Sequence, residues 1–199
     1  MSSFDARARD WDKNRIHIER SEAIASAMLD TLPLTSKMNA LEYGAGTGLL
    51  SFCLKDQFAD ITLMDNSQEM VRVTQEKIAD EKIEHIWALW FDLEHTDYEH
   101  RFDIVFNQMV LHHVIDVETI LKKFYALLNP GGYLAIADLY TEDGSFHGPD
   151  VKVHWGFDPD KLTEALKSIG FKNVGYKTCF EIKREGGKNY PIFLLTSCK

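Results

Sequence analysis

The chain has 199 residues, of which 45% are hydrophobic and 12% aromatic. That length can bury one good hydrophobic core, so we expect a single domain over residues 1–199. The formal net charge of −9 argues against a nucleic-acid partner, because binding to a phosphate backbone requires clustered Lys and Arg. The three cysteines are far apart and lack Cys-x-x-Cys spacing, so we expect neither a disulfide framework nor a thiolate metal site.

The sequence also lacks the usual signals for secretion or membrane insertion. Its N-terminus has no apolar stretch of signal-peptide length, and no later segment is apolar over a membrane-spanning length. We therefore expect a soluble, cytoplasmic protein that binds neither membranes nor nucleic acid.

The first 36 residues differ in pattern from the rest of the chain. Residues 1–14 are polar and aromatic, and apolar residues then recur at helical spacing from Ile16 to Leu29. This spacing predicts an amphipathic helix that ends before Pro33. We expect residues 1–36 to form a helical cap on the core.

In the core, residues 37–199, strand-like apolar runs alternate with helical patterns, which predicts parallel strands joined by right-handed crossovers. A later helix starts near Pro159, and residues 171–182 and 190–195 form a hairpin with an antiparallel last strand. The pattern indicates an α/β fold with a doubly wound, mostly parallel sheet. The other predicted strands are residues 38–43, 60–65, 83–88, 102–107 and 132–139, and the other predicted helices are residues 48–56, 67–80 and 117–128.

A glycine-rich loop joins the first strand of the core to the first helix. Gly44, Gly46 and Gly48 alternate in it, and glycine permits left-handed backbone and a close approach to a ligand. A dinucleotide-binding loop carries its third glycine where this chain has Leu49, so the spacing disfavours a pyrophosphate ligand. Glu42, just before the loop, suits an ammonium group better than a phosphate. We therefore expect a ligand without phosphate.

Polar residues follow three more strands at the edge where open α/β sheets bind ligands. Asp65 ends the second strand about twenty residues after Gly44, where a carboxylate can accept from both ribose hydroxyls. Asp92 follows the third strand and Gln108 the fourth. The fifth strand is entered through residues 127–138, Leu-Leu-Asn-Pro-Gly-Gly-Tyr-Leu-Ala-Ile-Ala-Asp.

In this order the five segments resemble the motifs of the class I S-adenosylmethionine-dependent methyltransferases, of the UbiE-like small-molecule type (methyltransferase type 11/25 domain). Glu-x-Gly-x-Gly-x-Gly after a strand resembles their motif I, and Leu-x-Pro-Gly-Gly-x-Leu resembles their entry to the fifth strand. The resemblance covers residues 38–140. It implies a Rossmann-like, seven-stranded sheet, S-adenosyl-L-methionine as cofactor, and methyl transfer (EC 2.1.1.-) to an oxygen, nitrogen or sulfur of a small molecule.

The same resemblance implies roles for individual residues. Glu42 and the glycine loop would hold the methionine part of the cofactor, Asp65 the ribose and Asp92 the adenine. Trp11 would fold over the site from the N-terminal cap. The residues implied for the cofactor are Trp11, Glu42, Gly44, Ala45, Gly46, Gly48, Asp65, Asn66, Met70, Asp92, Leu93, Gln108 and Met109.

Methyl transfer by in-line displacement depends on proximity, alignment and exclusion of water, so no catalytic side chain is obligatory. His112 and His113 follow the fourth strand, where one could act as a general base or both could simply shape the pocket. Tyr140 begins a loop of about residues 140–157 whose aromatic, acidic and histidine content is typical of a substrate lid. The histidines of this loop lack metal-site spacing, so we expect no metal.

Several alternatives stay open at the level of sequence. After the fourth strand stands Asn-Gln-Met-Val, residues 107–110, and not the Asn-Pro-Pro-Tyr element of enzymes that methylate amide or adenine nitrogens, which favours a small-molecule acceptor. A protein acceptor and a non-catalytic S-adenosylmethionine-binding module are the alternatives. A nicotinamide-dependent dehydrogenase is disfavoured by Leu49 and by the lack of room for a second substrate domain. The sequence does not distinguish a monomer from a homodimer.

Overall fold

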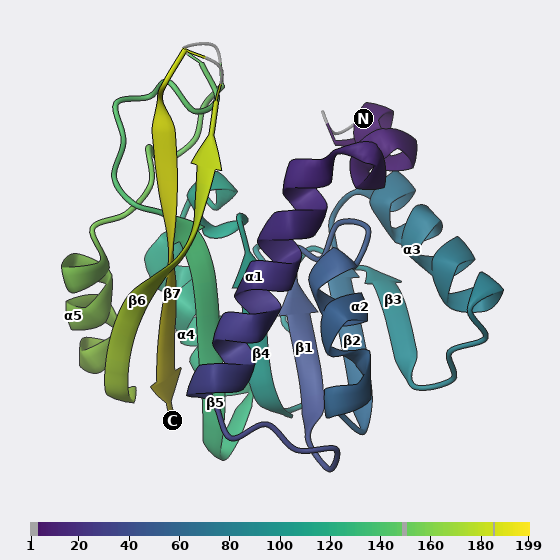
Figure 1. Ribbon diagram of the computed structural model, residues 1–199. Coiled ribbons are helices and arrows are strands. Elements are labelled where there is room, and N and C mark those ends of the chain that lie inside the picture. The colour runs from purple at the N-terminus through teal and green to yellow at the C-terminus, as the bar shows by residue number, and fades with distance from the viewer. Residues whose placement is uncertain (1–3, 149–150, 185) are drawn as a thin grey trace.

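The computed structural model describes residues 4–148, 151–184 and 186–199. At its centre is a seven-stranded sheet in the order β3-β2-β1-β4-β5-β7-β6 (Figure 1). Strands β1 to β5 pair in parallel, and β7 pairs antiparallel with β5 and β6, so the predicted doubly wound, mostly parallel sheet is confirmed. The strands are β1 (Asn39–Tyr43), β2 (Asp60–Asp65), β3 (Ile86–Trp90), β4 (Phe102–Gln108), β5 (Leu128–Leu139), β6 (Lys172–Lys183) and β7 (Asn189–Cys198).

Helices flank the sheet on both faces (Figure 1). Residues of α1 and α2 share one buried cluster with the sheet, and residues of α4 and α5 share another. Within the described ranges, no helix has the length and apolar character needed to cross a membrane. The α-helices are α1 (Arg15–Thr31), α2 (Leu49–Leu54), α3 (Gln68–Asp80), α4 (Val117–Leu127) and α5 (Pro159–Ile169), and the 3-10 helices are η1 (Asp5–Lys13), η2 (Lys55–Gln57) and η3 (Leu111–His113).

Neighbouring residues of the central strands point to opposite faces of the sheet. Ala40 of β1 and Ile104 of β4 lie in the cluster with α1 and α2, whereas Leu41 and Val105 lie in the cluster with α4 and α5. A strand covered on both faces needs apolar residues at every position, which explains why these strands read as continuous apolar runs.

Two strands begin more than one residue away from the start that the sequence predicts. β3 begins at Ile86 instead of residue 83, because α3 continues into a turn in which Lys82 has φ 54° and the Ile83 amide donates to Ile78 O. β5 begins at Leu128 instead of residue 132, because Leu128 already pairs with Phe102 before the register shifts. Both differences come from pairing and turn geometry that hydrophobic periodicity does not encode.

The predicted helical cap is present, and it is more ordered than its sequence suggests. The polar and aromatic residues before α1 form η1, and the Asn14 side chain caps α1 by accepting from the Ile16 amide at 3.1 Å. Asp12 of η1 accepts from Lys77 Nζ of α3 at 2.7 Å and from the Thr47 hydroxyl. These contacts hold η1 over the glycine loop.

Candidate functional site

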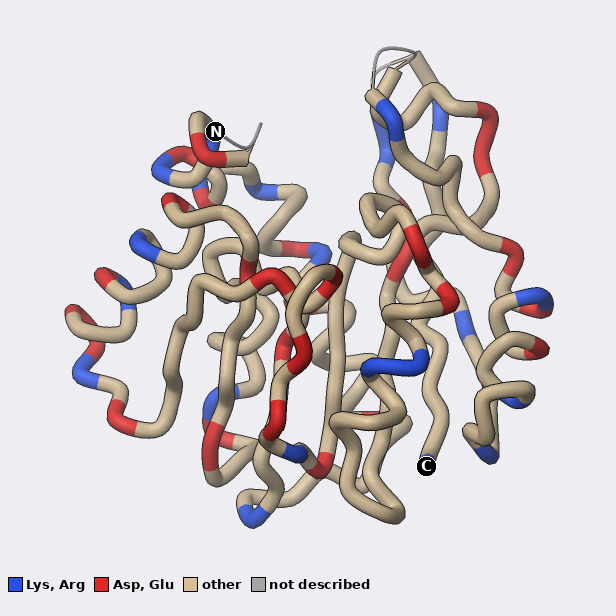
Figure 2. Tube along the Cα trace, turned by 180° about the vertical axis from the view of Figure 1, so that it is seen from behind, with Lys and Arg blue, Asp and Glu red and all other residues tan. Residues whose placement is uncertain are grey.

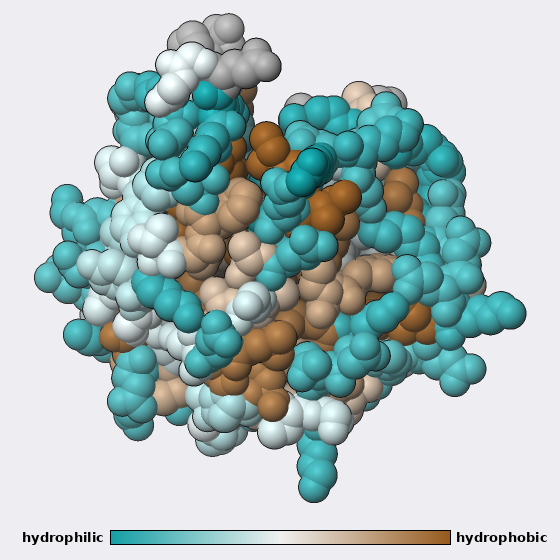
Figure 3. All heavy atoms as spheres, in the orientation of Figure 1, coloured by the Kyte–Doolittle hydropathy of each residue, from teal (hydrophilic) through white to brown (hydrophobic). Residues whose placement is uncertain are grey.

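A cavity of about 300 Å³ opens at the carboxyl ends of the parallel strands. In the sheet, β1 lies between β2 and β4, and the chain winds away from it in both directions, which is the switch point where open α/β sheets bind ligands. The cavity is lined from η1 and α1, from the glycine loop, from the ends of β2, β3 and β4, and from the loop after β5. Figure 3 shows the molecule hollowed between the lobe of the β6–β7 hairpin and the lobe of η1, with hydrophobic residues in the hollow.

The glycine loop follows the prediction closely. Gly44, Gly46 and Gly48 have φ of 65°, 56° and 78°, all in the left-handed region that favours glycine. Gly44, Ala45 and Gly46 line the cavity. Gly48 instead precedes α2, where a Cβ would lie 2.8 Å from Leu63 Cδ2, so its glycine serves packing and it does not line the cavity.

Replacing Gly44 with alanine tests this geometry. An alanine Cβ would lie 2.4 Å from Val110 Cγ2 in addition to adopting an unfavourable φ. We expect Gly44→Ala to lower the free energy of unfolding by about 2 kcal/mol or more, since left-handed backbone alone costs about 1–2 kcal/mol. Gly131→Ala is the matched control, because Gly131 has φ 79° with nothing within 4 Å of the added Cβ. Equal losses in urea denaturation of the two variants would contradict the close approach of Val110.

Glu42 lies beneath the loop and does not line the cavity. It is fully buried, and its Oε2 accepts from the Ser51 amide at 3.1 Å and from the Ser51 hydroxyl. Its Oε1 has no hydrogen-bond partner among the described residues. Burial raises the pKa of Glu42 to about 8, so the carboxyl is mostly protonated at pH 7 without a ligand. Its predicted contact with the methionine part of the cofactor stays a prediction.

The raised pKa makes stability depend on pH. The folded state keeps a proton on Glu42 up to about pH 8, whereas an unfolded chain releases it near pH 4.5, so the stabilisation is complete below pH 4.5 and is lost as the pH rises toward 8. We expect the free energy of unfolding to fall by about 1.4 kcal/mol per pH unit between about pH 5.5 and 7, and by about half as much per unit near pH 8, without cofactor. Glu42→Gln should remove this slope in urea denaturation, whereas Glu118→Gln, at an exposed side chain of α4, should keep it. A slope that survives Glu42→Gln would refute the assignment.

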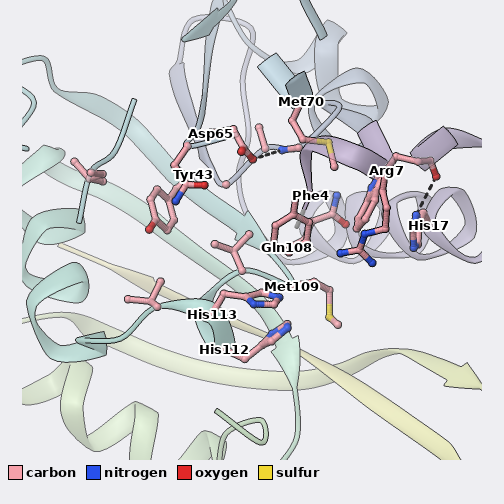
Figure 4. Close-up of a pocket in the computed structure, with 18 of the residues that line it drawn as sticks. Phe4, Arg7, His17, Tyr43, Asp65, Met70, Gln108, Met109, His112 and His113 are labelled. Atoms are coloured by element: carbon pink, nitrogen blue, oxygen red, sulfur yellow. Dashed lines mark hydrogen bonds between the residues drawn. The ribbon is translucent and has the colours of Figure 1, made fainter. Parts of the chain in front are cut away.

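Asp65 ends β2 and faces the cavity beside the glycine loop (Figure 4). Its Oδ2 accepts from the Gly46 amide at 2.7 Å and its Oδ1 from the Ser67 amide at 2.8 Å. Burial raises the pKa of Asp65, while the two amide donors act in the opposite direction. Because each carboxylate oxygen can accept two hydrogen bonds, both oxygens keep a lone pair for a ligand hydroxyl. The carboxyl group is therefore fixed in an orientation that suits a diol.

Three further predicted residues line the same end of the cavity, namely Asn66, Asp92 and Leu93. Asp92 Oδ1 accepts from the Glu94 amide at 3.0 Å, and its Oδ2 lies 2.9 Å from His95 Nδ1. These contacts hold the Asp92 carboxylate next to the end of β3. The acidic groups at the ends of β2 and β3 thus share one wall, as the sequence predicts.

Trp11, Met70, Gln108 and Met109, for which the sequence predicts contacts with the cofactor, also line the cavity. The Gln108 side chain accepts from Ser21 Oγ of α1 at 3.1 Å, which ties the end of β4 to the cap. Met109 has φ 54°, which is uncommon for a residue with a side chain and marks stored strain of the kind found at binding sites. This left-handed residue turns the chain out of β4 and into η3, which carries two histidines.

Three histidines meet opposite Asp65: His112 and His113 of η3, and His147 of the loop after β5. His112 is fully buried, and its Nδ1 lies 2.6 Å from Oδ1 of Asp138, which is also fully buried. His112 Nε2 lies 2.9 Å from His147 Nε2. A carboxylate only accepts, so His112 carries a proton on Nδ1 and donates it to Asp138. The sequence predicts His112 and His113 as site residues and includes His147 in the predicted substrate lid, but it assigns no role to Asp138.

The environment keeps two of these histidines neutral. Burial, followed by the neighbouring histidines, lowers the pKa of His113 to about 3, and burial with the charge of nearby groups lowers that of His147 to about 4. A neutral imidazole can take up a proton or bind a metal ion. One ligand atom from each of the three histidines lies within 4.8 Å of the others, so these residues could hold a transition-metal ion. The sequence-based expectation of no metal stays a prediction.

Tyr140, predicted as a catalytic candidate, does not line the cavity. It packs on the face of the sheet covered by α4 and α5, with its ring centroid 5.4 Å from that of Phe193. Its hydroxyl lies 2.9 Å from Thr178 Oγ1 of β6. Strand pairing at the end of β5 holds Tyr140 on this face of the sheet. Its position therefore gives no support to a catalytic role.

Arg20 of α1 is a residue of the site that the sequence analysis misses. It lines the cavity at 6% exposure, and its Nε has no hydrogen-bond partner among the described residues. Burial lowers the pKa of Arg20 to about 10, and the charge of Asp138 acts in the opposite direction. An arginine on the core side of an amphipathic helix is the signal that could have revealed it.

Comparison with known proteins gives a consistent result. A family model described as a methyltransferase domain matches residues 41–136. An uncharacterized methyltransferase of Staphylococcus carnosus is 30% identical over 146 residues, which cover 72% of this chain and 67% of that protein. The chain spans between 55% and 67% of the length of three such curated relatives.

Solved structures share the fold at low sequence identity. A Haloferax volcanii protein, described as a putative methyltransferase in complex with the Trm112 methyltransferase activator, superposes with a TM-score of 0.82 at 17% identity over 100% of this chain and 98% of that chain. The N-methyltransferase NodS of Bradyrhizobium japonicum, in complex with S-adenosyl-L-homocysteine, gives 0.72 at 17% identity over 94% of this chain and 89% of that chain. At these identities the likeness shows the Rossmann-like fold alone.

Proposed function

Since the chain belongs to the class I S-adenosylmethionine-dependent methyltransferases, whose cofactor is S-adenosylmethionine, we propose that it transfers a methyl group to an oxygen, nitrogen or sulfur of a small molecule. The observation that carries the proposal is the pairing of the glycine loop with Asp65. Bare backbone and a fixed carboxylate face one cavity there, joined by the hydrogen bond from the Gly46 amide to Asp65 Oδ2.

The cofactor, when bound, supplies an electrophilic methyl group on a sulfonium. Asp65 would accept hydrogen bonds from the ribose hydroxyls, and Asp92 would lie at the adenine. The backbone of residues 44–46 would approach the methionine part. These roles are supported by the fit of the residues: two free carboxylate lone pairs at Asp65, and left-handed backbone at Gly44 and Gly46 in the wall of the cavity.

The side chains that enclose the cavity support a small acceptor. Trp11 closes it from the N-terminal cap, and Phe146 and His147 close it from the loop after β5, which we propose as the substrate lid. Enclosure on several sides suits a small molecule and helps to exclude water from the methyl transfer. A protein segment would need an open groove.

The histidines can orient an acceptor by hydrogen bonding. His113 and His147 are neutral at pH 7 and line the cavity, so a ring nitrogen without a proton can accept a hydrogen bond from the acceptor, while the lowered pKa values make both rings weak bases. His112 is buried between Asp138 and His147, so we assign it a positioning role: its hydrogen bond to His147 Nε2 orients that ring.

A single assay with radiolabelled S-adenosylmethionine and a metabolite extract tests the proposal, together with calorimetric titration of S-adenosylhomocysteine. We expect binding of the nucleoside and transfer of label into the low-molecular-mass fraction. Label found only in protein would replace the small molecule with a protein acceptor. Binding without transfer to either fraction would indicate a non-catalytic binding module.

A further inference from the structure

The charged side chains of the cavity are divided between its two ends. Asp65, Asp92 and Glu94 lie at or just after the ends of β2 and β3, where the proposed function places the nucleoside. Three arginines, Arg7, Arg20 and Arg184, line the rest of the cavity in a protein whose net charge is −9. A local excess of positive charge in an acidic protein points to an anionic ligand at that end.

Contacts place two of these arginines beside the histidines. The Arg7 guanidinium lies 5.0 Å from the ring centroid of Phe4, which lies 5.2 Å from that of His113. The Arg184 guanidinium lies 4.6 Å from the ring centroid of Phe146, which lies 4.8 Å from that of His147. Aromatic faces orient the planar guanidinium groups without neutralising their charge.

Arg20 reaches the same region from α1. Asp138, which binds His112, is the acidic group whose charge acts on Arg20, so these side chains share one neighbourhood. Arg20 is buried, yet no carboxylate lies within ion-pair distance of it among the residues that the structure describes. A buried guanidinium without a counter-ion is unfavourable unless a ligand supplies the charge.

Three arginines outside the cavity, Arg9, Arg15 and Arg72, form ion pairs with glutamates, whereas Arg101 and the cavity arginines form none among the described residues. Arg72 of α3 pairs with Glu69 at 2.7 Å and with Glu76 at 3.2 Å, and Arg15 of α1 pairs with Glu19 at 2.6 Å. Figure 2 shows acidic and basic positions alternating along α3. Within the described ranges, by contrast, Arg7, Arg20 and Arg184 form no ion pair with the protein.

We propose that the methyl acceptor is an anion, whose carboxylate or phosphate group is bound by Arg20 together with Arg184 and Arg7, next to the three histidines. The inference rests on the proposed function. The cofactor does not account for these arginines, because it carries one carboxylate and one guanidinium satisfies a carboxylate by a bidentate pair. The guanidinium groups also oppose a divalent cation at the histidines, which leaves the imidazoles free to hydrogen-bond the acceptor.

Anion binding to the full chain saturated with S-adenosylhomocysteine tests this inference. The probes are inorganic phosphate and malonate, titrated calorimetrically at constant ionic strength set with NaCl. We expect at least one of them to bind, with the affinity lowered about tenfold or more by Arg20→Met and by Arg184→Met. The stronger probe indicates whether the natural group is a phosphate or a carboxylate. Arg72→Met is the matched control and should bind as the wild type does, because Arg72 lies outside the cavity.

Titration of the variants with S-adenosylhomocysteine shows whether a loss of anion binding has another cause. Arg20→Met should bind S-adenosylhomocysteine within about threefold of the wild type, which also shows that the variant is folded. If it loses affinity for S-adenosylhomocysteine but not for methylthioadenosine, which lacks the amino-acid part, Arg20 binds the cofactor carboxylate and the inference is overturned. It is likewise overturned if neither anion binds, or if both arginine variants bind anions as the wild type does. Transfer of label only to protein, with anion binding intact, would instead refute the small-molecule function.

Discussion

Replacing Asp65 with alanine is expected to weaken the binding of S-adenosylhomocysteine by at least about tenfold, because a charge-assisted hydrogen bond to a ligand hydroxyl contributes about 1–2 kcal/mol or more. Both carboxylate oxygens already accept one amide each, from Gly46 and Ser67, and each keeps a lone pair toward the cavity. Loss of the side chain therefore removes the acceptors for the ribose and also releases the Gly46 amide. Calorimetric titration measures the change directly.

Asp65→Asn is the informative partner of this variant. Asparagine keeps one acceptor oxygen, so it can hold one of the two amides while presenting an NH₂ group to the other. We expect its affinity to fall to a value between those of the wild type and Asp65→Ala. An affinity unchanged by Asp65→Ala would remove the ribose assignment, and with it the main support for the proposed cofactor geometry.

Removal of His112 is expected to give the largest loss of stability. Its ring is fully buried between Asp138 Oδ1 at 2.6 Å and His147 Nε2 at 2.9 Å. His112→Ala would leave the buried Asp138 carboxylate with the backbone amides of residues 112 and 139 as its hydrogen-bond donors. Breaking a buried hydrogen-bonded pair of this kind costs about 3–5 kcal/mol, to be measured as the free energy of unfolding in urea.

A double-mutant cycle separates the pair from simple loss of volume. Asp138→Ala and the double variant complete the cycle, and we expect a coupling energy of about 1–3 kcal/mol between the two positions. His113→Ala serves as the control, since His113 is only partly buried and makes ring contacts to His112 and His147 instead of a bond to Asp138. Additive losses at positions 112 and 138 would show that the hydrogen bond does not stabilise the fold.

Both the family and most of the elements could be predicted from local patterns. β2 and α3 agree with their predicted spans to within one residue, because an apolar run and a Ser67 cap are signals carried by neighbouring residues. The glycine loop and Asp65 were found for the same reason, since their spacing reflects one strand–loop–helix unit and the next strand. The prediction for Tyr140 rests on the composition and length of its loop and on its place after a strand, and the structure places Tyr140 on the opposite face of the sheet from α1 and α2.

The sequence by itself determined the alternating α/β order, the glycine loop and the acidic strand ends, because each depends on residues close together in the chain. Only the tertiary structure decided that His112 meets Asp138, 26 residues away, and His147, 35 residues away. It also decided that Arg20 of the cap is buried in the same cavity. Contacts across such separations follow from strand order and helix packing, and no local pattern of residues records them.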